Sequence, residues 1–399
     1  MPKREGFLYD SLVDKAFLKK CVKQSLSKKK KKRRDVKKVV CDIDGTVDMM
    51  YNTFANDDYT PTPPYTCPII DRCSGKDREL CIQPYNYDGV INTAIVEVLK
   101  PIILRGMHHW SCSSVKGRGG QRMLDYNQRV AHKKAKNSKY IAELDIKQYY
   151  PSVPLRNVIK ALERKIKDKK FLLLVAVSMS CYEPGMKYAV EHGLSAYDVV
   201  GDKVGLNIGM LLSQWTGNYY LEPLDRFILT LDGVMYESRN MDNIIIAGRN
   251  KRKLHRAVEA IQQFLHDELG LELKDDWQVF KLYRDKRYTD KTGTPKIKRS
   301  RKISTVGYLI GRDRVMMRQK NFLRMVRQCN RAKKKKQQGK SIPVKMAQGI
   351  ISRMGFLKHC TDSFHAREKY IYPLGVSKLK KIISADAKRR NAMLKGVAA

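Results

Sequence analysis

The sequence predicts an α+β fold in which helices pack on one face of a β-sheet. Two segments with strand character, residues 141–146 and 235–248, each place an aspartate at a strand end. Segments with helical spacing lie between them, and an amphipathic stretch follows the second. Strand, helix, hairpin and helix in this order are typical of such a layered sheet. With 399 residues and 42% hydrophobic side chains, the chain can bury a sizeable core in two or three subdomains.

The N-terminal region begins with a basic segment and continues into loop and helix. Residues 28–34 are an unbroken run of Lys and Arg, which we expect to be a nucleic-acid-binding arm rather than a merely solvated tail. Residues 48–75 are rich in Tyr, Pro, Thr and Asp, which favours a loop. Apolar residues follow helical spacing through residues 88–104, and residues 111–120 form a polar loop that contains glycine.

The central region carries the predicted sheet. Residues 141–146 alternate as a half-buried strand does. Residues 156–170 are predicted to form a basic helix with a buried helical continuation. Residues 235–248 have the pattern of a hairpin whose turn falls at residues 241–243. An amphipathic helix follows, and we expect Gly270 to end it.

The C-terminal region is strongly basic. Residues 283–302 contain Gly and Pro among many cations and are predicted to form an exposed loop. After residues 306–308 the pattern becomes mostly helical, with a loop expected at residues 333–336. We expect this region to be a separate subdomain that grips nucleic acid.

The charge of the chain indicates a polyanionic partner. Lys and Arg outnumber Asp and Glu by 80 to 40, for a formal net charge of +40. Such an excess repels itself unless a polyanion such as nucleic acid neutralises it. The cations expected to contact nucleic acid most directly are Lys28, Lys29, Lys30, Lys31, Lys32, Arg33, Arg34, Lys333, Lys334, Lys335 and Lys336.

A membrane partner is not expected. The longest apolar run, residues 171–177, is far shorter than the roughly 20 residues that cross a bilayer. The N-terminus lacks a signal-peptide core, and no lipidation site is evident. We therefore expect an intracellular protein whose nine cysteines are reduced. Cys67, Cys73 and Cys81 cluster loosely, but their spacing is not that of a CxxC pair, so zinc binding is not favoured.

Asp145 and Asp242 are the candidate catalytic residues. Either aspartate alone is well explained as a turn former at the end of a strand. Together, on neighbouring strands, two carboxylates can hold a pair of divalent ions for phosphoryl transfer. In so basic a chain, the polymer that such a site extends is expected to be nucleic acid.

Six motifs in this order resemble those of reverse transcriptases. The resemblance covers roughly residues 78–375. The motifs are residues 144–150 (LDIKQYY), the first catalytic motif; 205–215 (GLNIGMLLSQW), the template and dNTP motif, which runs into LEPLD at 221–225; 239–243 (RNMDN), in the place of the YxDD box; 270–273 (GLEL) with Trp277-Gln278; 306–308 (VGY), the primer grip; and 355–359 (GFLKH), a thumb motif.

This resemblance implies a right-hand polymerase with fingers, an antiparallel-sheet palm and a helical thumb. The corresponding division is a basic segment at residues 1–34, fingers at 35–140, a palm at 141–312 with finger helices around 156–195, and a thumb at 313–399. It further implies two Mg²⁺ ions, with Mn²⁺ as a substitute, and as substrates dNTPs, a template RNA and a cDNA or DNA primer.

Within that family, residues 208–214 are similar to the (I/V/L)GxxxSQ signature of diversity-generating retroelements. Those enzymes copy a template-repeat RNA into error-prone cDNA, together with a small basic accessory protein. Membership would place the chain in the cytoplasm of a bacterial or phage-infected cell. A defence-type or group II intron-like reverse transcriptase is the nearest alternative.

The resemblance assigns a role to each matching residue. Asp145, Asp242 and the backbone carbonyl of Ile146 would hold the metal ions, with Asn243 beside them. Tyr150 would crowd a ribose 2′-hydroxyl, and Ile208 would loosen the dNTP pocket. The remaining candidates are Gly209 and Gln214 in the dNTP pocket, Arg118 and Arg78 at the triphosphate, and Lys274 as general acid.

One departure from the family pattern affects the catalytic site. Asn240 stands where the family has tyrosine, and Asn243 stands where it has a second aspartate. Asparagine keeps an oxygen that can approach a metal ion but removes one negative charge. Two outcomes remain open, an active enzyme with a weakened metal site and an RNA-binding scaffold with little activity.

A second motif competes with this interpretation. Residues 39–47 (VVCDIDGTV) are similar to the strand and DxDGT nucleophile motif of haloacid-dehalogenase-type phosphatases, with Asp42 as nucleophile and Asp44 as acid or base. That fold requires a parallel doubly wound sheet and later motifs, which the sequence lacks. We therefore interpret the segment as a coincidental strand and turn.

Overall fold

The computed structural model describes residues 4–27, 33–70, 77–289, 292–361 and 363–395. Lys28, Lys29, Lys30, Lys31 and Lys32 of the predicted basic arm lie outside these residues, as does Cys73. The chain divides into two compact units. Unit 1 comprises Met1–Gly119, Leu144–Ile246 and Arg252–Gln278, and unit 2 comprises Gly120–Glu143, Ala247–Lys251 and Val279–Ala399.

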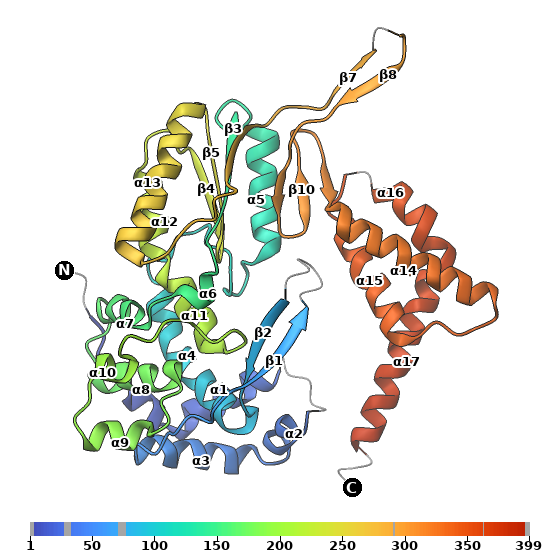
Figure 1. Cartoon of the computed structure of the whole chain (residues 1–399). Helices are drawn as coiled ribbons and strands as arrows, with labels where there is room; N and C mark the ends of the chain where they lie inside the picture. Colours follow the sequence, from blue (N-terminus) through green and yellow to red (C-terminus); the bar gives the residue numbers. More distant parts are fainter. Residues whose placement is uncertain (1–3, 28–32, 71–76, 290–291, 362, 396–399) are drawn as a thin grey trace. The chain divides into compact units, whose positions relative to one another are not determined.

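The N-terminal part of unit 1 packs helices around the buried helix α4. Nearly every side chain of α4 is buried, as the predicted helix at residues 88–104 requires. The predicted loop at residues 48–75 is wrong at both ends, because α3 continues to Ala55 and a strand begins at Tyr65. The elements, seen in Figure 1, are η1 Asp10–Val13, α1 Lys15–Leu26, α2 Arg34–Cys41, α3 Ile43–Ala55, the hairpin of β1 Tyr65–Ile70 and β2 Asp77–Ile82, η2 Tyr85–Gly89 and α4 Val90–Leu104.

The phosphatase-like segment is helical, so the expected strand is wrong. Asp42 separates α2 from α3 and caps α3, because its side chain accepts a hydrogen bond from the backbone N–H of Gly45 at 2.7 Å. Asp44 is exposed and pairs with Lys19 at 2.7 Å. A capping aspartate between two helices cannot present the nucleophile at the end of a strand, as that phosphatase fold requires.

A cluster of short helices in unit 1 follows the strand β3, Tyr140–Asp145. The predicted helix at residues 156–170 is two helices, because the side chain of Asp168 accepts a hydrogen bond from the N–H of Phe171 at 2.9 Å and starts a new helix there. The second helix, α8, is buried as expected. The bounds are α6 Tyr149–Ser152, α7 Leu155–Glu163, α8 Lys169–Ser180, α9 Gly185–Glu191, α10 Ala196–Val200, α11 Leu211–Tyr220 and α12 Glu222–Thr230.

The central sheet has four strands in the order β4-β5-β3-β6, where β3 is Tyr140–Asp145, β4 Tyr236–Asn240, β5 Asn243–Gly248 and β6 Gln278–Lys281. Strands β4 and β5 form the hairpin predicted from the sequence. Helix α13 (Lys251–Leu269) ends at Gly270, whose φ of +61° stops the helix as expected. Strands β3, β5 and β6 each contain residues assigned to both units.

Unit 2 contains α5, two small sheets and a group of helices. The predicted loop at residues 283–302 is wrong, because a two-stranded hairpin forms there. The elements are α5 Gly120–Lys133; the hairpin of β7 Lys286–Thr289 and β8 Pro295–Lys298; the sheet β11-β10-β9 of β9 Ile303–Thr305, β10 Tyr308–Ile310 and β11 Val315–Met317; and α14 Gln319–Gln337, α15 Val344–Leu357, α16 Ser363–Ala366, η3 Arg367–Ile371, η4 Tyr372–Leu374 and α17 Val376–Lys395.

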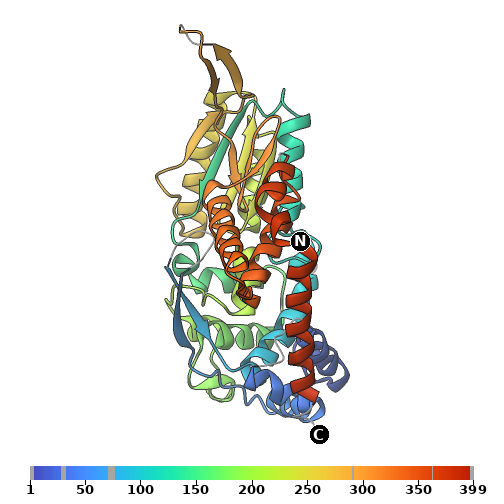
Figure 2. The same cartoon turned by 90° about the vertical axis from the view of Figure 1, so that its right-hand side faces the viewer.

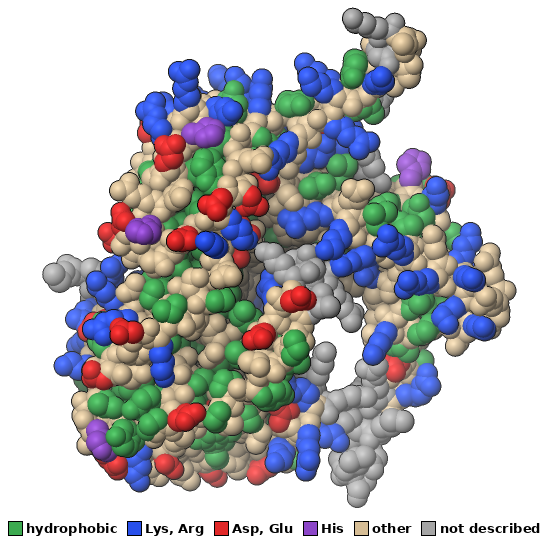
Figure 3. All heavy atoms as spheres, in the orientation of Figure 1, with side chains coloured by type: hydrophobic (Ala, Val, Ile, Leu, Met, Phe, Trp, Pro, Cys, Tyr) green, Lys and Arg blue, Asp and Glu red, His purple; other side chains and the backbone are tan. Residues whose placement is uncertain are grey.

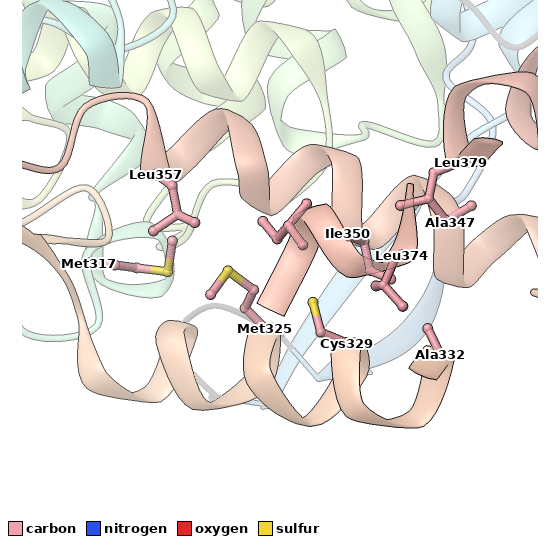
Figure 4. Close-up of a cluster of buried hydrophobic side chains, with 10 residues drawn as sticks. Met317, Met325, Cys329, Ala332, Ala347, Ile350, Leu357, Leu374 and Leu379 are labelled. Atoms are coloured by element: carbon pink, nitrogen blue, oxygen red, sulfur yellow. The ribbon is translucent and has the colours of Figure 1, made fainter. Parts of the chain in front are cut away.

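The C-terminal helices share a core of their own (Figure 4). Met325 and Cys329 of α14 meet Ile350 of α15 there, with further contributions from β11, η4 and α17. The loop predicted at residues 333–336 is wrong, since these lysines continue α14. Lysine is a good helix former, and the buried Ala332 keeps that turn packed. Figure 2 shows the same helices from the side, with α17 extending beyond the others.

The mixed fold with antiparallel sheets is therefore confirmed. Among the described residues, no helix combines the length and the apolar character needed to span a bilayer.

Candidate active site

The structure brings Asp145 and Asp242 together in unit 1. Asp145 is the last residue of β3, and Asp242 lies in the turn between β4 and β5. The backbone N–H of Ile146 donates to the carbonyl of Asp242 at 3.1 Å, which fixes the two strand ends side by side. Burial and the negative charge of Asp145 raise the pKa of Asp242. The two carboxyl groups therefore repel each other within one half-buried site.

Lys274 supplies a cation to this carboxylate pair. Its backbone N–H donates to the carbonyl of Asp145 at 2.9 Å, and its ammonium group contacts the Asp145 carboxylate. Both side chains are about 30% exposed, at 30% and 29%. Lys274 thus lies directly against one of the two candidate metal-binding carboxylates.

Asn243 lies beside Asp242 and binds it directly. The Asn243 amide nitrogen donates to the Asp242 carboxylate at 3.2 Å. An aspartate at this position would instead add a third negative charge to the site. The asparagine therefore lowers the attraction of the site for cations without removing its oxygen ligands.

A buried arginine supports the turn that carries Asp242. Arg239 is fully buried and forms an ion pair with Asp225, with nitrogen–oxygen distances of 2.5 and 2.7 Å. Its guanidinium also donates to the Asn218 side-chain oxygen at 3.0 Å, to the Ser111 hydroxyl at 3.0 Å and to the carbonyl of Met241 at 3.3 Å. A buried charge is tolerated only with such complete pairing.

The bond from Arg239 to Met241 holds a strained residue. Met241 has a φ of +56°, in the left-handed region that side chains other than glycine rarely adopt. The main chain of the preceding strand is fixed as well, since Arg239 N–H donates to the Trp110 carbonyl at 3.1 Å and Cys112 N–H donates to the Arg239 carbonyl at 2.8 Å. The hydrogen bonds of Arg239 therefore fix the geometry of the turn that carries Asp242.

A second buried pair links Glu237 of β4 to His108. Glu237 is fully buried and lies 2.8 Å from the ring nitrogen of His108, whose side chain is 15% exposed. Burial raises the pKa of Glu237. Burial alone would lower the pKa of His108, but the hydrogen bond and charge of Glu237 raise it above its ordinary value. The negative charge of Glu237 therefore stabilises the charged form of His108 within this buried pair.

The candidate dNTP-pocket residues lie around these carboxylates. Burial and the charge of Asp242 raise the pKa of Tyr150 to about 12, and Arg78 opposes that shift, so all three groups interact. Gly209 has a φ of +111°, and a Cβ there would lie 2.9 Å from the Cys81 carbonyl. Cys81 N–H donates to the Ile208 carbonyl at 2.7 Å. Residues 208–209 therefore pack closely against β2, the strand that carries Arg78.

Two further candidates have structural partners of their own. Gln214 lies in the first turn of α11, where its N–H donates to the Met210 carbonyl at 3.4 Å. The guanidinium of Arg118 donates to the carbonyls of His108 at 2.9 Å and Ser111 at 3.3 Å. Arg118 thus stabilises the loop that packs beside Arg239.

The basic candidates lie elsewhere in the chain. Arg33 pairs with Asp35 through two bonds of 3.0 and 2.5 Å, and Arg34 begins α2. The four lysines at residues 333–336 lie in the last turns of α14. Figure 3 shows Lys and Arg side chains spread over the C-terminal helices with few acidic ones among them.

The donor atoms of the site suit a hard divalent cation. The described residues contain no group of three or more His, Cys, Asp or Glu side chains arranged to hold a metal ion. The candidate ligands at this site are the carboxylates of Asp145 and Asp242, the amide oxygen of Asn243 and the carbonyl of Ile146. All four are oxygen groups of the kind that Mg²⁺ accepts as ligands. The ammonium of Lys274 already contacts Asp145, so this carboxylate has a cation beside it.

The sequence did not reveal the buried residues that hold the turn of Asp242 in place. Arg239 and Asp225 stand within two of the quoted motifs, but no role was expected of them. The available signal was an arginine inside a predicted hairpin strand, close to the turn that carries Asp242.

Comparison with known proteins places the chain in a family. The sequence signature described as "Reverse transcriptase (RNA-dependent DNA polymerase)" matches residues 74–308. A protein of Schizosaccharomyces pombe described as "Uncharacterized 91 kDa protein in cob intron" is 27% identical over 187 residues, which are 46% of this chain and 21% of that protein. The chain thus spans about a fifth of that curated relative.

Two solved structures are similar at low identity. One is telomerase from Candida albicans, with 12% identity, a TM-score of 0.40 and coverage of 66% of this chain and 47% of that chain. The other is apo telomerase from Candida tropicalis, with 11% identity, a TM-score of 0.43 and coverage of 79% and 59%. At these TM-scores, the likeness has no bearing on function.

The family signature covers more than half of the chain, and the mixed fold with antiparallel sheets is consistent with a right-hand polymerase. This chain belongs to the reverse transcriptase family.

Proposed function

We propose that the chain is an active RNA-directed DNA polymerase that uses Asp145 and Asp242 to hold two divalent ions, Mg²⁺ or in its place Mn²⁺. The observation that carries the proposal is the convergence of these carboxylates at the ends of β3 and β4. The bond from Ile146 N–H to the Asp242 carbonyl and the raised pKa of Asp242 both support it.

Each residue of the site has a separate proposed role in nucleotide addition. When bound, the ions would lower the pKa of the primer 3′-hydroxyl and neutralise charge on the leaving pyrophosphate. Lys274 donates a proton to that leaving group. Tyr150 excludes a ribose 2′-hydroxyl, while Ile208 with Gly209 and Gln214 shapes the pocket for base and template.

Arg78 and Arg118 are the proposed contacts to the triphosphate. Arg78 is exposed and interacts with Tyr150 across the pocket. Arg118 already donates to two loop carbonyls, so it must exchange these bonds to reach the substrate.

Primer extension on an RNA template tests the proposal. Asp242→Ala removes a proposed metal ligand but leaves the hydrogen bonds of Arg239 in place. We expect the rate of primer extension to fall by about a thousandfold, which is the scale of losing one electrostatic contact to a transition state. Lys187→Ala, on the exposed surface of α9, is the control. Unchanged extension by Asp242→Ala would show that the site assignment is wrong.

Asn243→Asp tests whether the asparagine weakens the metal site. The added charge should preserve or raise activity and lower the Mg²⁺ concentration at half-maximal rate. A Mg²⁺ titration of both proteins measures this. A higher Mg²⁺ requirement in the variant would contradict the proposed role of Asn243.

The finer proposal is a diversity-generating enzyme with fingers at residues 35–140, a palm at 141–312 and a thumb at 313–399. It would copy a template-repeat RNA in the cytoplasm of a bacterial or phage-infected cell, together with a small basic accessory protein. The (I/V/L)GxxxSQ match at residues 208–214 supports it. Sequencing the cDNA tests it, since errors should concentrate opposite adenine, and uniformly faithful cDNA would reject this subtype alone.

Two alternatives each have an observation in their favour. The similarity to a protein in a cob intron favours an intron-type reverse transcriptase. The Asn243 substitution favours an RNA-binding scaffold, which would bind RNA in a salt-sensitive manner without incorporating dNTPs.

A further inference from the structure

The β7–β8 hairpin of unit 2 has two different faces. Its register pairs Lys286 with Lys298 and Tyr288 with Lys296. Directly opposed residues of an antiparallel pair point to the same side. One face therefore carries three lysines and a tyrosine, and we call these four residues the lysine–tyrosine face. The described residues of both strands include no Asp or Glu.

This hairpin has no core to stabilise it. All side chains described in its two strands are exposed, including Tyr288 at 50% and Ile297 at 52%. An isolated two-stranded hairpin is marginally stable, and like charges placed directly opposite weaken it further. Lys286 opposite Lys298 is therefore unfavourable in the free protein and becomes favourable only when a polyanion lies against it.

The base of the hairpin is anchored by a buried ion pair. Asp285 pairs with Lys302 at 3.1 Å, and their side chains are only 11% and 7% exposed. The backbone N–H of Ser300 donates to Asp285 at 2.8 Å. The Asp285 carboxylate at the base of the hairpin is thus already paired with Lys302. Figure 1 shows β7 and β8 as a projecting hairpin, and Figure 3 shows Lys and Arg side chains on that projection.

We propose that the lysine–tyrosine face binds a single-stranded segment of RNA outside the polymerase site. The exposed ring of Tyr288 stacks on a base, and Lys286, Lys296 and Lys298 neutralise neighbouring phosphates. An exposed aromatic ring among cations suits unstacked bases, whereas the deep, narrow major groove of an RNA duplex does not admit side chains. The choice of RNA rests on the proposed function, while the binding face itself does not.

Equilibrium binding of the full chain to a labelled 20-nucleotide single-stranded RNA tests the proposal. The Lys286→Ala/Lys298→Ala double variant should lower the slope of log affinity against log salt by about 1.4, since each phosphate contact to a single strand contributes roughly 0.7. Tyr288→Ala should weaken binding by about tenfold, and Tyr288→Phe should keep it, because phenylalanine still stacks.

Matched controls separate this face from general electrostatics. Lys160→Ala/Lys187→Ala removes the same charge from exposed positions of unit 1, and Tyr188→Ala removes another exposed tyrosine. Both controls should change binding less than twofold. Equal losses in the hairpin and control variants would overturn the proposal, as would tighter binding to an RNA duplex or unchanged RNA binding with lost affinity for an acidic protein.

The outcome is independent of catalysis. The hairpin variants should keep the wild-type rate of single-nucleotide addition at saturating primer–template, because they leave unit 1 intact. If Asp242→Ala fails to stop extension while the hairpin variants lose RNA binding, the polymerase assignment fails and the binding face stands. The reverse pattern rejects the binding face alone.

Discussion

The charges beneath the active-site turn and those on the β7–β8 hairpin are organised in opposite ways. Arg239 and Asp225 are fully buried and paired with each other, and neighbouring polar groups complete the hydrogen bonds of Arg239. On the hairpin, lysines are exposed and lie opposite one another. Water screens exposed charges, but the protein interior does not. Complete pairing therefore indicates a structural role, whereas the exposed lysine–tyrosine face is the proposed site for a partner from outside the chain.

The largest effect is expected from breaking the buried pair. Arg239→Met leaves Asp225 buried without its counter-charge and frees the strained turn at Met241, so the free energy of unfolding should fall by about 3–5 kcal/mol. Urea unfolding measures the loss. Removing both charges in Arg239→Met/Asp225→Leu should recover much of it.

An exposed pair provides the control for this comparison. Lys19 and Asp44 are 2.7 Å apart, but their side chains are 44% and 77% exposed. Lys19→Met should change stability little, because solvent screens this pair. Equal losses for Arg239→Met and Lys19→Met would mean that burial does not distinguish the two regions.

A smaller effect is expected from pH at the His108–Glu237 pair. Both groups have raised pKa values in the fold, so both contribute stability that is present at low pH and lost as pH rises. For His108 the loss begins above its ordinary pKa of 6.5. The free energy of unfolding should therefore decrease as pH rises through and beyond that value.

His108→Gln isolates the histidine contribution, since glutamine can still donate a hydrogen bond to Glu237 but does not titrate. The variant should show a flatter dependence of stability on pH in the neutral range, measured by urea unfolding at several pH values. The same slope in both proteins would show that this pair does not control the dependence.

The smallest effect on stability is expected from reversing one hairpin charge. Lys298→Glu places opposite charges across the strand pair with Lys286, which should stabilise the hairpin by about 0.2–1 kcal/mol. The same change should weaken binding of single-stranded RNA. In the same variant, the resistance of the hairpin to proteolysis should therefore rise while the affinity for RNA falls. Weaker resistance to proteolysis would contradict the account of the Lys286–Lys298 pair.

Local sequence patterns predicted several elements correctly. The β4–β5 hairpin, the buried helix α4 and the end of α13 at Gly270 all follow from residue spacing or from glycine chemistry. The single helix predicted at residues 156–170 was wrong because one side chain, that of Asp168, caps a new helix, α8. The pattern also failed where lysines continued α14, because a run of charge looks like a loop although lysine favours a helix.

The candidate site was predictable only in part. Two aspartates at predicted strand ends indicated a shared site, and the motif order indicated which other residues to consider. The sequence did not indicate that Arg239 would be buried, nor that its guanidinium would meet Ser111, Asn218 and Asp225.

By itself, the sequence determined the hairpin with Asp242 in its turn and the strand that ends at Asp145, because both depend on short-range periodicity. Tertiary structure alone decided which charges lie in the interior and which partner each meets there. A buried ion pair needs two elements distant in the chain to close on each other, and no local spacing encodes that meeting.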